Sequence, residues 1–244
     1  AEVSRFINGI RFFPAISNDN IWAALLTSAD IPSDLERNLT CLLAIYCNVL
    51  NLISESQVDG LTGLGNRKLF DADLVLELEH VSQANKRRLS DLKAQNSAYL
   101  VLLDVDKFKL VNDQYGHLIG DEVLLTLAQK IKASFRDQDC LYRYGGEEFA
   151  IILKEIDESA VDEVLNRFVA KIRADKFPTV GHITISIGHC RLDVGEAPSS
   201  FITKADKALY YSKQNGRDQA SNYHRLLSQG AIQESAIETD IELF

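Results

Sequence analysis

The hydrophobic pattern in the middle of the chain predicts two strands of one sheet. The unbroken apolar run at residues 99–103 is typical of a strand buried on both faces, and we expect that strand at residues 97–105. Apolar runs at residues 140–144 and 149–153 flank Gly145-Gly146. Two small residues between strand-like runs predict a hairpin.

Other periodic segments predict the elements around these strands. A third strand is expected at residues 182–191. Helical patterns cover residues 66–95, 107–114, 120–136, 158–175 and 198–214. Strands that alternate with helices in this way indicate an α/β fold, with a mixed central sheet flanked by helices.

A further helix is predicted near the N-terminus, at residues 33–57. Residues 39–53 are 15 residues without a charge, which is shorter than the roughly 20 residues that a membrane-spanning helix needs. We therefore expect no membrane span. The apolar positions recur at helical spacing, which fits either a helix packed on its own domain or a two-chain helical seam that pairs protomers.

Charge and cysteine content limit the classes of partner. With a formal net charge of -9, the chain lacks the basic surface that grips polymeric nucleic acid. A small nucleotide with Mg²⁺ remains compatible with this charge. The four cysteines show no CxxC spacing, which is typical of reduced core thiols and predicts a cytoplasmic protein.

Acidic residues stand at the ends of the predicted strands. Asp104 and Asp106 end the first strand, and Glu147 and Glu148 open the second strand of the hairpin. Carboxylates at the tips of neighbouring strands form an oxygen-rich site suited to Mg²⁺ and a phosphate substrate. The pattern predicts a metal-dependent nucleotide enzyme, in which Asp106 is a solvated strand-end acid or a helix N-cap.

Several segments together resemble the GGDEF family of diguanylate cyclases. The segments are Asp59-Gly-Leu-Thr-Gly-Leu-Gly-Asn-Arg67, Asp104-Val-Asp-Lys-Phe-Lys109, Asn112-Asp-Gln-Tyr-Gly-His117, Gly120-Asp121, Arg143-Tyr-Gly-Gly-Glu-Glu-Phe149, Ser186-Ile-Gly188 and Ala205-Asp-Lys-Ala-Leu-Tyr210. Family members join two GTP molecules into cyclic di-GMP on a palm-like sheet related to nucleotidyl cyclases. The resemblance covers roughly residues 55–224, and Gly-Gly-Glu-Glu-Phe is a variant compatible with activity.

The resemblance implies a division of the chain. The chain would consist of a helical regulatory or dimerisation segment at residues 1–57, a catalytic domain at residues 58–224 and a C-terminal tail at residues 225–244. Each active site of the family holds one GTP, so the resemblance also implies a homodimer of facing catalytic domains.

The resemblance also implies a metal site at the strand ends. Mg²⁺, with Mn²⁺ as an alternative, would be bound by the carboxylates of Asp104 and Glu147 and the carbonyl of Val105, while Glu148 would assist a second ion. Glu147 would also accept the proton of the attacking 3′-hydroxyl, and metal-assisted deprotonation without a protein base is equally consistent.

Three basic residues would face the phosphates according to the same resemblance. Lys109 would stabilise charge in the transition state, and Lys213 and Arg217 would reach the terminal phosphates. The sequence has Asp218 where many relatives have Asn, and Lys107 where an aromatic residue is common, but neither change removes a metal ligand.

Base recognition and feedback are implied by two further sets of residues. A carboxylate can accept both donors on the guanine edge and an amide can complete it, and Asp121 and Asn112 occupy these positions. His117 contacts the nucleotide or shapes the loop. Arg136 and Asp139 match an RxxD motif that binds cyclic di-GMP as an inhibitor.

Two other classes of function remain open on the sequence alone. A degenerate domain of this family could bind GTP or cyclic di-GMP without turnover. Alternatively, the chain could be a dimeric interaction protein that works through the helix at residues 33–57. Neither class predicts magnesium-dependent turnover.

Overall fold

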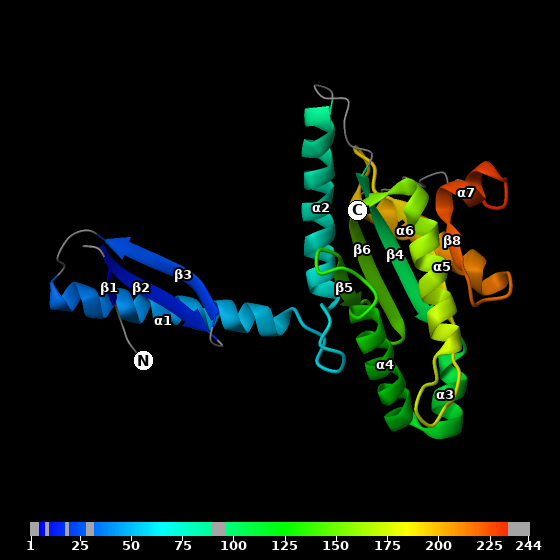
Figure 1. The fold of residues 1–244 in the computed structure, drawn as a ribbon, viewed down its shortest axis with the longest axis horizontal. Helices are drawn as coiled ribbons and strands as arrows, with labels where there is room; N and C mark the ends of the chain where they lie inside the picture. The colour runs from blue at the N-terminus through cyan, green and yellow to red at the C-terminus, as the bar shows by residue number, and fades with distance from the viewer. Residues whose placement is uncertain (1–4, 8–9, 18–19, 28–31, 89–95, 234–244) are drawn as a thin grey trace, which may run out of the picture. The chain divides into compact units, whose positions relative to one another are not determined.

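The chain divides into two compact units, Ala1–Val58 and Asp59–Phe244. The computed structural model describes residues 5–7, 10–17, 20–27, 32–88 and 96–233, and the elements are labelled in Figure 1. The division lies one residue from the predicted boundary between residues 57 and 58.

The first unit contains a sheet that the sequence analysis did not predict. Its strands are β1 (Arg5–Ile7), β2 (Ile10–Ser17) and β3 (Asn20–Thr27), which are antiparallel in the order β1-β2-β3. The description of residues 1–57 as a helical segment is therefore incomplete. Strands are stabilised by pairing with one another and by packing, which local periodicity does not contain, and the pattern alone therefore missed them.

The helix α1 (Ser33–Ser56) follows this sheet and contacts β2. Cys47 is buried, whereas Cys41 is exposed, so the prediction that all cysteines are core thiols is wrong for Cys41. A second face of α1 carries exposed apolar side chains, between 46% and 65% exposed: Leu35, Leu42, Ile45, Tyr46, Val49, Leu52 and Ile53.

The second unit is built on a five-stranded sheet with the order β5-β6-β4-β7-β8. The pairs β5–β6, β6–β4 and β4–β7 are antiparallel, and the pair β7–β8 is parallel. The strands are β4 (Asn96–Val105), β5 (Cys140–Arg143), β6 (Glu148–Asp157), β7 (Ile185–Arg191) and β8 (Ala220–Asn222). The sheet is mixed, which confirms the predicted fold class.

Helices cover both faces of this sheet, as Figure 1 shows. One face packs against α4 (His117–Lys132) and α5 (Glu158–Ala174), and the other against α2 (Arg67–Arg88) and α6 (Pro198–Gln214). β4 alternates between the two cores, since Val101 and Leu103 belong to the first and Leu100 and Leu102 to the second. Burial on both faces explains its unbroken apolar run.

Several predicted bounds differ from the structure. α2 ends at Arg88, and residues 89–95 of the predicted helix lie outside the described residues. α3 (Phe108–Tyr115) is followed directly by α4, which begins three residues earlier than predicted, at His117. Strand β8 and helix α7 (Tyr223–Ser228) were not predicted. α7 crosses the predicted start of the tail at residue 225, with Leu226 in the core.

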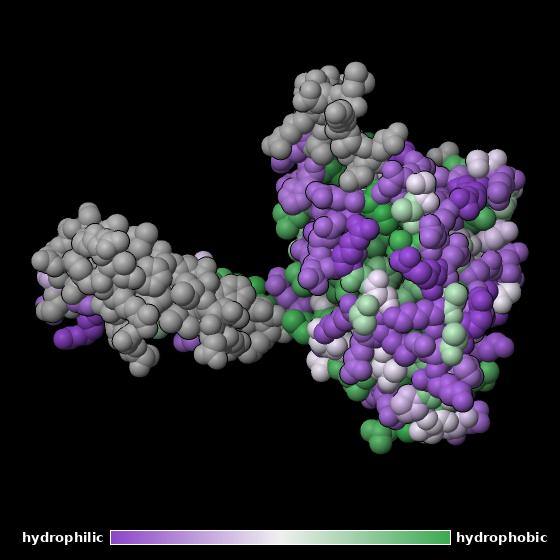
Figure 2. Space-filling view, viewed as in Figure 1, coloured by the Kyte–Doolittle hydropathy of each residue, from purple (hydrophilic) through white to green (hydrophobic). Residues whose placement is uncertain are grey.

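The surface of the second unit is mainly polar. Hydrophilic residues dominate the face shown in Figure 2, and hydrophobic residues appear there in small patches. Within the described part of the chain, none of the helices has the length and apolarity needed to cross a bilayer.

Candidate active site

The sheet brings the acidic strand ends together. Asp104, near the end of β4, is paired with Glu148 of β6 on one side and with Ser186 of β7 on the other. The main-chain N–H of Val105 donates to the carbonyl of Glu147 at 3.4 Å. Asp104 and Glu148 therefore lie on adjacent strands, and Glu147 immediately precedes the second of them.

The hairpin between β5 and β6 forms as predicted around the glycine pair. The N–H groups of Tyr144 and Gly145 both donate to the carbonyl of Glu148, at 2.8 and 3.2 Å. Glu147 is the last residue of the turn and Glu148 the first of β6. The turn therefore holds both glutamates at the strand end, next to Asp104.

Lys213, in the last turn of α6, brings a positive charge to the carboxylates. Its Nζ lies 2.8 Å from Oδ2 of Asp104, whose side chain is only 8% exposed. Burial raises the pKa of Asp104, the hydrogen bond and charge of Lys213 lower it, and the charges of Glu148 and Asp106 raise it further. The net direction of the pKa shift is upward, so one lysine does not offset burial together with the neighbouring carboxylates.

The pKa of Glu147 is raised in the same way. Burial is the largest cause, the charge of Asp104 adds to it, Lys213 opposes it and Glu148 contributes a further increase. Carboxylates that raise one another's pKa disfavour their own ionised forms, and a cation placed among them relieves this repulsion. The donor set therefore suits a hard divalent cation, which prefers oxygen ligands.

No preformed metal cluster accompanies this charge. In the part of the chain that the structure describes, no group of three or more His, Cys, Asp or Glu side chains is arranged to hold a metal ion. Asp104 is paired with Lys213 instead. A metal ion bound by Asp104 would compete with this ion pair.

A cavity of about 240 Å³ opens beside Glu148. Its lining includes Tyr144 from the hairpin and Thr203 and Asp206 from α6. The volume is below the roughly 300–1,000 Å³ of pockets that enclose a small-molecule ligand. A nucleoside triphosphate therefore needs more room than this cavity provides.

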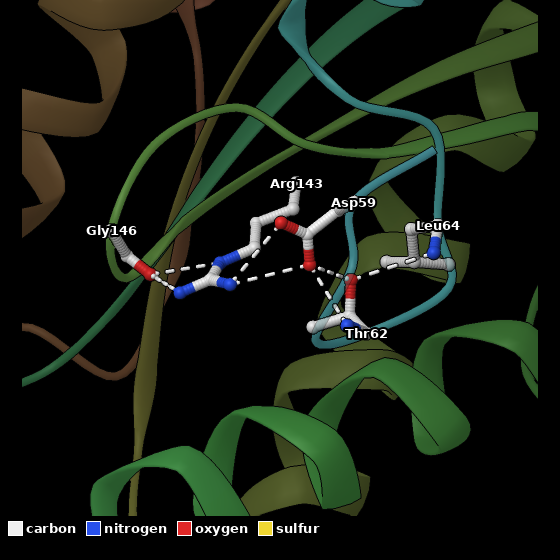
Figure 3. A network of polar contacts seen from close by, with 5 residues as sticks. All are labelled: Asp59, Thr62, Leu64, Arg143 and Gly146. Carbon is white, nitrogen blue, oxygen red and sulfur yellow. Dashed lines mark hydrogen bonds and ion pairs between the residues drawn. The ribbon is translucent and has the colours of Figure 1, made fainter. Parts of the chain in front are cut away.

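Arg143 ties the hairpin to the turn that precedes α2, as Figure 3 shows. Its Nε and Nη2 donate to the carbonyl of Gly146 at 3.1 and 2.8 Å, and its Nη1 donates to both carboxylate oxygens of Asp59 at 3.2 Å. Asp59 also accepts from the N–H and hydroxyl of Thr62. Burial acts to raise the pKa of Asp59, but the hydrogen bonds from Thr62 and Arg143 lower it overall.

Asp59 and Arg143 occur within longer sequence motifs, which predicted no individual role for either residue. Asp59 is the first residue of the second unit, and Arg143 binds the turn that carries Glu147. The pair therefore fixes the signature hairpin to the start of this unit. The 84-residue separation between them hides this contact from local patterns.

The residues predicted to read the base lie on α3 and α4. Asn112 packs so closely on Gly120 that a Cβ there would lie 1.9 Å from its Oδ1, and this oxygen is buried without a hydrogen-bond partner. Asp121 follows Gly120 and is exposed, as is His117 at the start of α4. The structure thus places Asn112 and Asp121 near one another, with an unsatisfied amide oxygen between the helices.

Lys109 and Arg217 are exposed on different elements. Lys109 lies on α3, and Arg217 lies in the loop between α6 and β8. Of the three predicted phosphate-binding residues, Lys213 is the one that the structure joins directly to a strand-end carboxylate.

Arg136 and Asp139 form the turn between α4 and β5. The carboxylate of Asp139 accepts from the N–H of Arg136 at 3.0 Å and from the N–H of Lys154 at 3.1 Å. These bonds stabilise the turn, and the residue Arg136 is exposed. Within this motif, Asp139 therefore stabilises the turn, while Arg136 is exposed to solvent.

The prediction for Asp106 is wrong. Asp106 is 7% exposed rather than solvated, and the N-cap residue of α3 is Lys107. The Asp106 carboxylate accepts hydrogen bonds from Thr184, Ser186 and the main chain of Asp218. These partners lie about 80 and 112 residues away in sequence, so only the folded sheet shows that the acid is buried.

Comparison with known proteins places the second unit in one family. Residues 56–219 match the family model described as "Diguanylate cyclase, GGDEF domain". The diguanylate cyclase DgcZ of Escherichia coli is 38% identical over 170 residues, which cover 68% of this chain and 53% of the relative. Diguanylate cyclase A of Treponema denticola is 34% identical over 196 residues, which cover 79% of this chain and 51% of the relative. The chain thus spans about half the length of these curated relatives.

Solved structures agree with this match. The crystal structure of the coiled coil and GGDEF domain of DgcB from Caulobacter crescentus, in complex with c-di-GMP, has a TM-score of 0.67 and 28% identity, and the match covers 78% of this chain and 97% of that chain. The active GGEEF domain of a diguanylate cyclase from Vibrio cholerae has a TM-score of 0.57 and 28% identity, and covers 65% and 96%.

Proposed function

The chain belongs to the GGDEF family of diguanylate cyclases, and we propose that it condenses two GTP molecules into cyclic di-GMP with release of two pyrophosphates. The observation that carries the proposal is the meeting of Asp104, Glu147 and Glu148 at adjacent strand ends, with Lys213 2.8 Å from Asp104. This set combines proton-accepting carboxylates with a cation for phosphate oxygens.

Each half-reaction forms one bond to phosphorus and breaks another. The 3′-oxygen of one GTP attacks the α-phosphorus of the other, and the bond from this phosphorus to the β-phosphate bridging oxygen breaks. The 3′-hydroxyl proton passes to the carboxylate of Glu147, which lies at the strand end beside Val105 and Glu148. Pyrophosphate leaves with negative charge, which Lys109, Lys213 and Arg217 offset.

A divalent metal ion is part of the proposal. The family is divalent-metal dependent, and Mg²⁺ or Mn²⁺ would be held by Asp104, the carbonyl of Val105 and Glu147, with Glu148 assisting. When bound, the ion would neutralise phosphoryl oxygens and acidify the attacking hydroxyl. The mutual repulsion of the carboxylates supports this assignment.

Guanine selection is assigned to α3 and α4. The carboxylate of Asp121 would accept from the N1–H and the amine of guanine, and Asn112 would complete the edge. The buried, unpartnered Oδ1 of Asn112 supports a polar ligand at this place. His117 would line the same site from the start of α4.

All described cysteines are free thiols, which supports a cytoplasmic location, where GTP is present.

The test is to incubate the purified protein with GTP and Mg²⁺ and to identify the products by chromatography. We expect cyclic di-GMP and pyrophosphate, no product when a chelator replaces Mg²⁺, and no dimeric product from ATP. Binding of GTP without any turnover, at any protein concentration, would instead establish a binding module and contradict the proposed activity.

Homodimerisation is proposed through α1, because the two GTP molecules must come from two facing domains. The exposed apolar residues repeat at heptad spacing: Leu35, Leu42 and Val49 form one series, and Ile45 and Leu52 another. Such a stripe, left exposed while another face of α1 contacts β2, is suited to a second copy of the same helix.

Replacing Leu42 and Val49 together by glutamate is therefore expected to dissociate the dimer, because four like charges would enter the helical seam. Light scattering should show the mass of one chain, and cyclic di-GMP formation at low micromolar protein should fall about tenfold or more. Asn48→Glu, on the same helix but outside the stripe, serves as the control. An unchanged dimer in the double variant would contradict this seam.

Product inhibition is proposed at Arg136 and Asp139. Arg136→Ala should weaken inhibition by cyclic di-GMP about tenfold or more, because a guanidinium that donates to phosphate and guanine is lost. The initial velocity should stay within about twofold, since Arg136 lies in the turn between α4 and β5, outside the strand ends. Inhibition curves measured beside Arg167→Ala, an exposed arginine of α5, check this; unchanged inhibition would refute it.

A further inference from the structure

Asp106 is a buried acid with neutral partners. Its Oδ1 accepts from the hydroxyl of Ser186 at 2.6 Å, and its Oδ2 accepts from the hydroxyl of Thr184 at 2.7 Å and from the main-chain N–H of Asp218 at 3.1 Å. The bonds to Thr184 and Ser186 join the ends of β4 and β7. The bond to Asp218 reaches a different segment, the loop that follows α6.

That loop has an unfavourable backbone conformation. Gly216, Arg217 and Asp218 have φ angles of 108°, 63° and 50°. Residues with a Cβ atom rarely adopt such angles, so two consecutive examples need support from the surrounding structure. One support is local, since the N–H of Arg217 donates to the carbonyl of Ser212 at 2.9 Å. The other contacts come from β4 and α5.

Asp218 is held on both sides. Its N–H is bound by Asp106, while Arg173 of α5 donates to its carbonyl at 2.9 Å and forms an ion pair with its carboxylate. Arg217, the residue immediately before Asp218, is exposed. The backbone that carries Arg217 is thus fixed while its guanidinium is left accessible.

The end of β4 therefore holds the C-terminal part of α6 and its loop at two points. Asp104 pairs with Lys213, and Asp106 accepts from the N–H of Asp218. Lys213 and Arg217 are also the two residues that we assign to the terminal phosphates. Because Asp106 is bonded to the loop backbone and buried, it does not need to touch the substrate to influence phosphate binding.

We propose that Asp106 is a positioning residue, which holds the loop at residues 216–218 so that Arg217 meets the terminal phosphates of GTP. The inference rests on the proposed function for the identity of the ligand. It assigns to Asp106 an effect on triphosphate affinity that acts through Arg217. Arg173 supports the same loop from the opposite side.

The test measures equilibrium binding of α,β-methylene GTP and of GMP by calorimetry, so that it does not depend on turnover. Asp106→Ala should weaken binding of the triphosphate analogue about tenfold and leave GMP binding within about twofold. Arg217→Ala should have the same selective effect. The double variant should bind the triphosphate analogue no more weakly than Arg217→Ala alone, because the effect of Asp106→Ala on affinity acts through the Arg217 side chain.

Two variants separate positioning from general stabilisation. Asp106→Asn keeps an oxygen for the N–H of Asp218 and should restore affinity to within about threefold. Ser186→Ala removes a hydrogen bond to the same carboxylate but not the bond to the loop, so it should lower the melting temperature without selective loss of the triphosphate analogue. If Asp106→Ala does not fold, Arg173→Met must show the selective weakening.

The proposal is overturned if the analogue and GMP lose affinity equally, if the effects of Asp106→Ala and Arg217→Ala multiply, or if neither Asp106→Ala nor Arg173→Met changes analogue binding. Absence of cyclic di-GMP formation by the wild-type protein would refute the proposed function separately, and the calorimetric comparison would still decide the role of Asp106.

Discussion

Glu147→Gln is expected to lower cyclic di-GMP formation by about 10²–10⁴-fold, the usual contribution of a proton-transfer residue. Glutamine has nearly the same shape but accepts no proton at neutral pH and is a poorer metal ligand. Glu147 is the last residue of the turn, next to Val105, to whose N–H its carbonyl is bonded. Initial rates of product formation, measured by chromatography at saturating GTP and Mg²⁺, check this expectation.

The pH dependence of activity should also reflect the role of Glu147. The pKa of Glu147 is raised, first by burial and then by the charge of Asp104. A bound divalent ion would oppose this shift, because it favours the ionised carboxylate. Activity should fall at low pH, where protonation of Glu147 removes both a proton acceptor and a metal ligand. A carboxyl group with a raised pKa contributes stability below its unfolded-state pKa and loses it as the pH rises through the folded-state pKa. Metal-free Glu147→Gln should therefore be at least as stable as the wild type at pH 7.

The matched control is Glu163→Gln, an exposed glutamate of α5. This variant should keep wild-type activity, because it lies outside the strand ends. Inactivity of Glu147→Gln together with an unchanged melting temperature would locate the loss in chemistry rather than folding. Retention of more than about a tenth of wild-type activity would show that Glu147 is not the proton acceptor.

Gly188→Ala is expected to cause the largest loss of stability, about 3 kcal/mol or more. Gly188 lies in β7 directly beneath α6, and a Cβ atom there would lie 2.0 Å from the main-chain nitrogen of Leu209 and 2.3 Å from the carbonyl oxygen of Ala205. These are backbone atoms, so no side-chain rotation can relieve the overlap. The helix must move away from the sheet.

Displacement of α6 should also reduce activity, because α6 carries Lys213 towards Asp104. Urea unfolding should show a lower midpoint, with the slope used to check that the variant still unfolds in one transition. Gly60→Ala serves as the control, since a Cβ at Gly60 meets nothing within 4 Å, and its stability should change by less than about 0.5 kcal/mol. Equal stability of the Gly188 and Gly60 variants would contradict the close approach of α6 to β7.

The two predictions show how distant motifs depend on one another. Ser186-Ile-Gly188 and Ala205-Asp-Lys-Ala-Leu-Tyr210 appeared in the sequence as separate signatures, and the structure shows that they meet at Gly188, Ala205 and Leu209. The glycine is needed because the helix backbone occupies the place of a side chain. This contact in turn sets the position of Lys213 near the strand ends.

Local patterns were sufficient for the elements with strong periodicity. The buried strand β4, the hairpin around Gly145-Gly146 and most of the helices followed from hydrophobic period and turn residues. The strand-end carboxylates could also be predicted, because Asp104 and Glu147 lie at the ends of apolar runs, and the structure shows that these runs pair as β4 and β6. The three strands of the first unit and α7 were missed, since their stability comes from pairing and packing.

By itself, the sequence determined the family, the order of the elements and the set of acidic and basic residues at the proposed site, because these depend on residue type and on spacing along the chain. Only the tertiary structure decided that Asp106 is buried and bound to the loop at residues 216–218, that Arg143 joins Asp59 to the hairpin, and that Gly188 lies against α6. Each of these contacts joins residues far apart in sequence. Burial and hydrogen bonding of such residues depend on the packing of whole elements, which local periodicity does not contain.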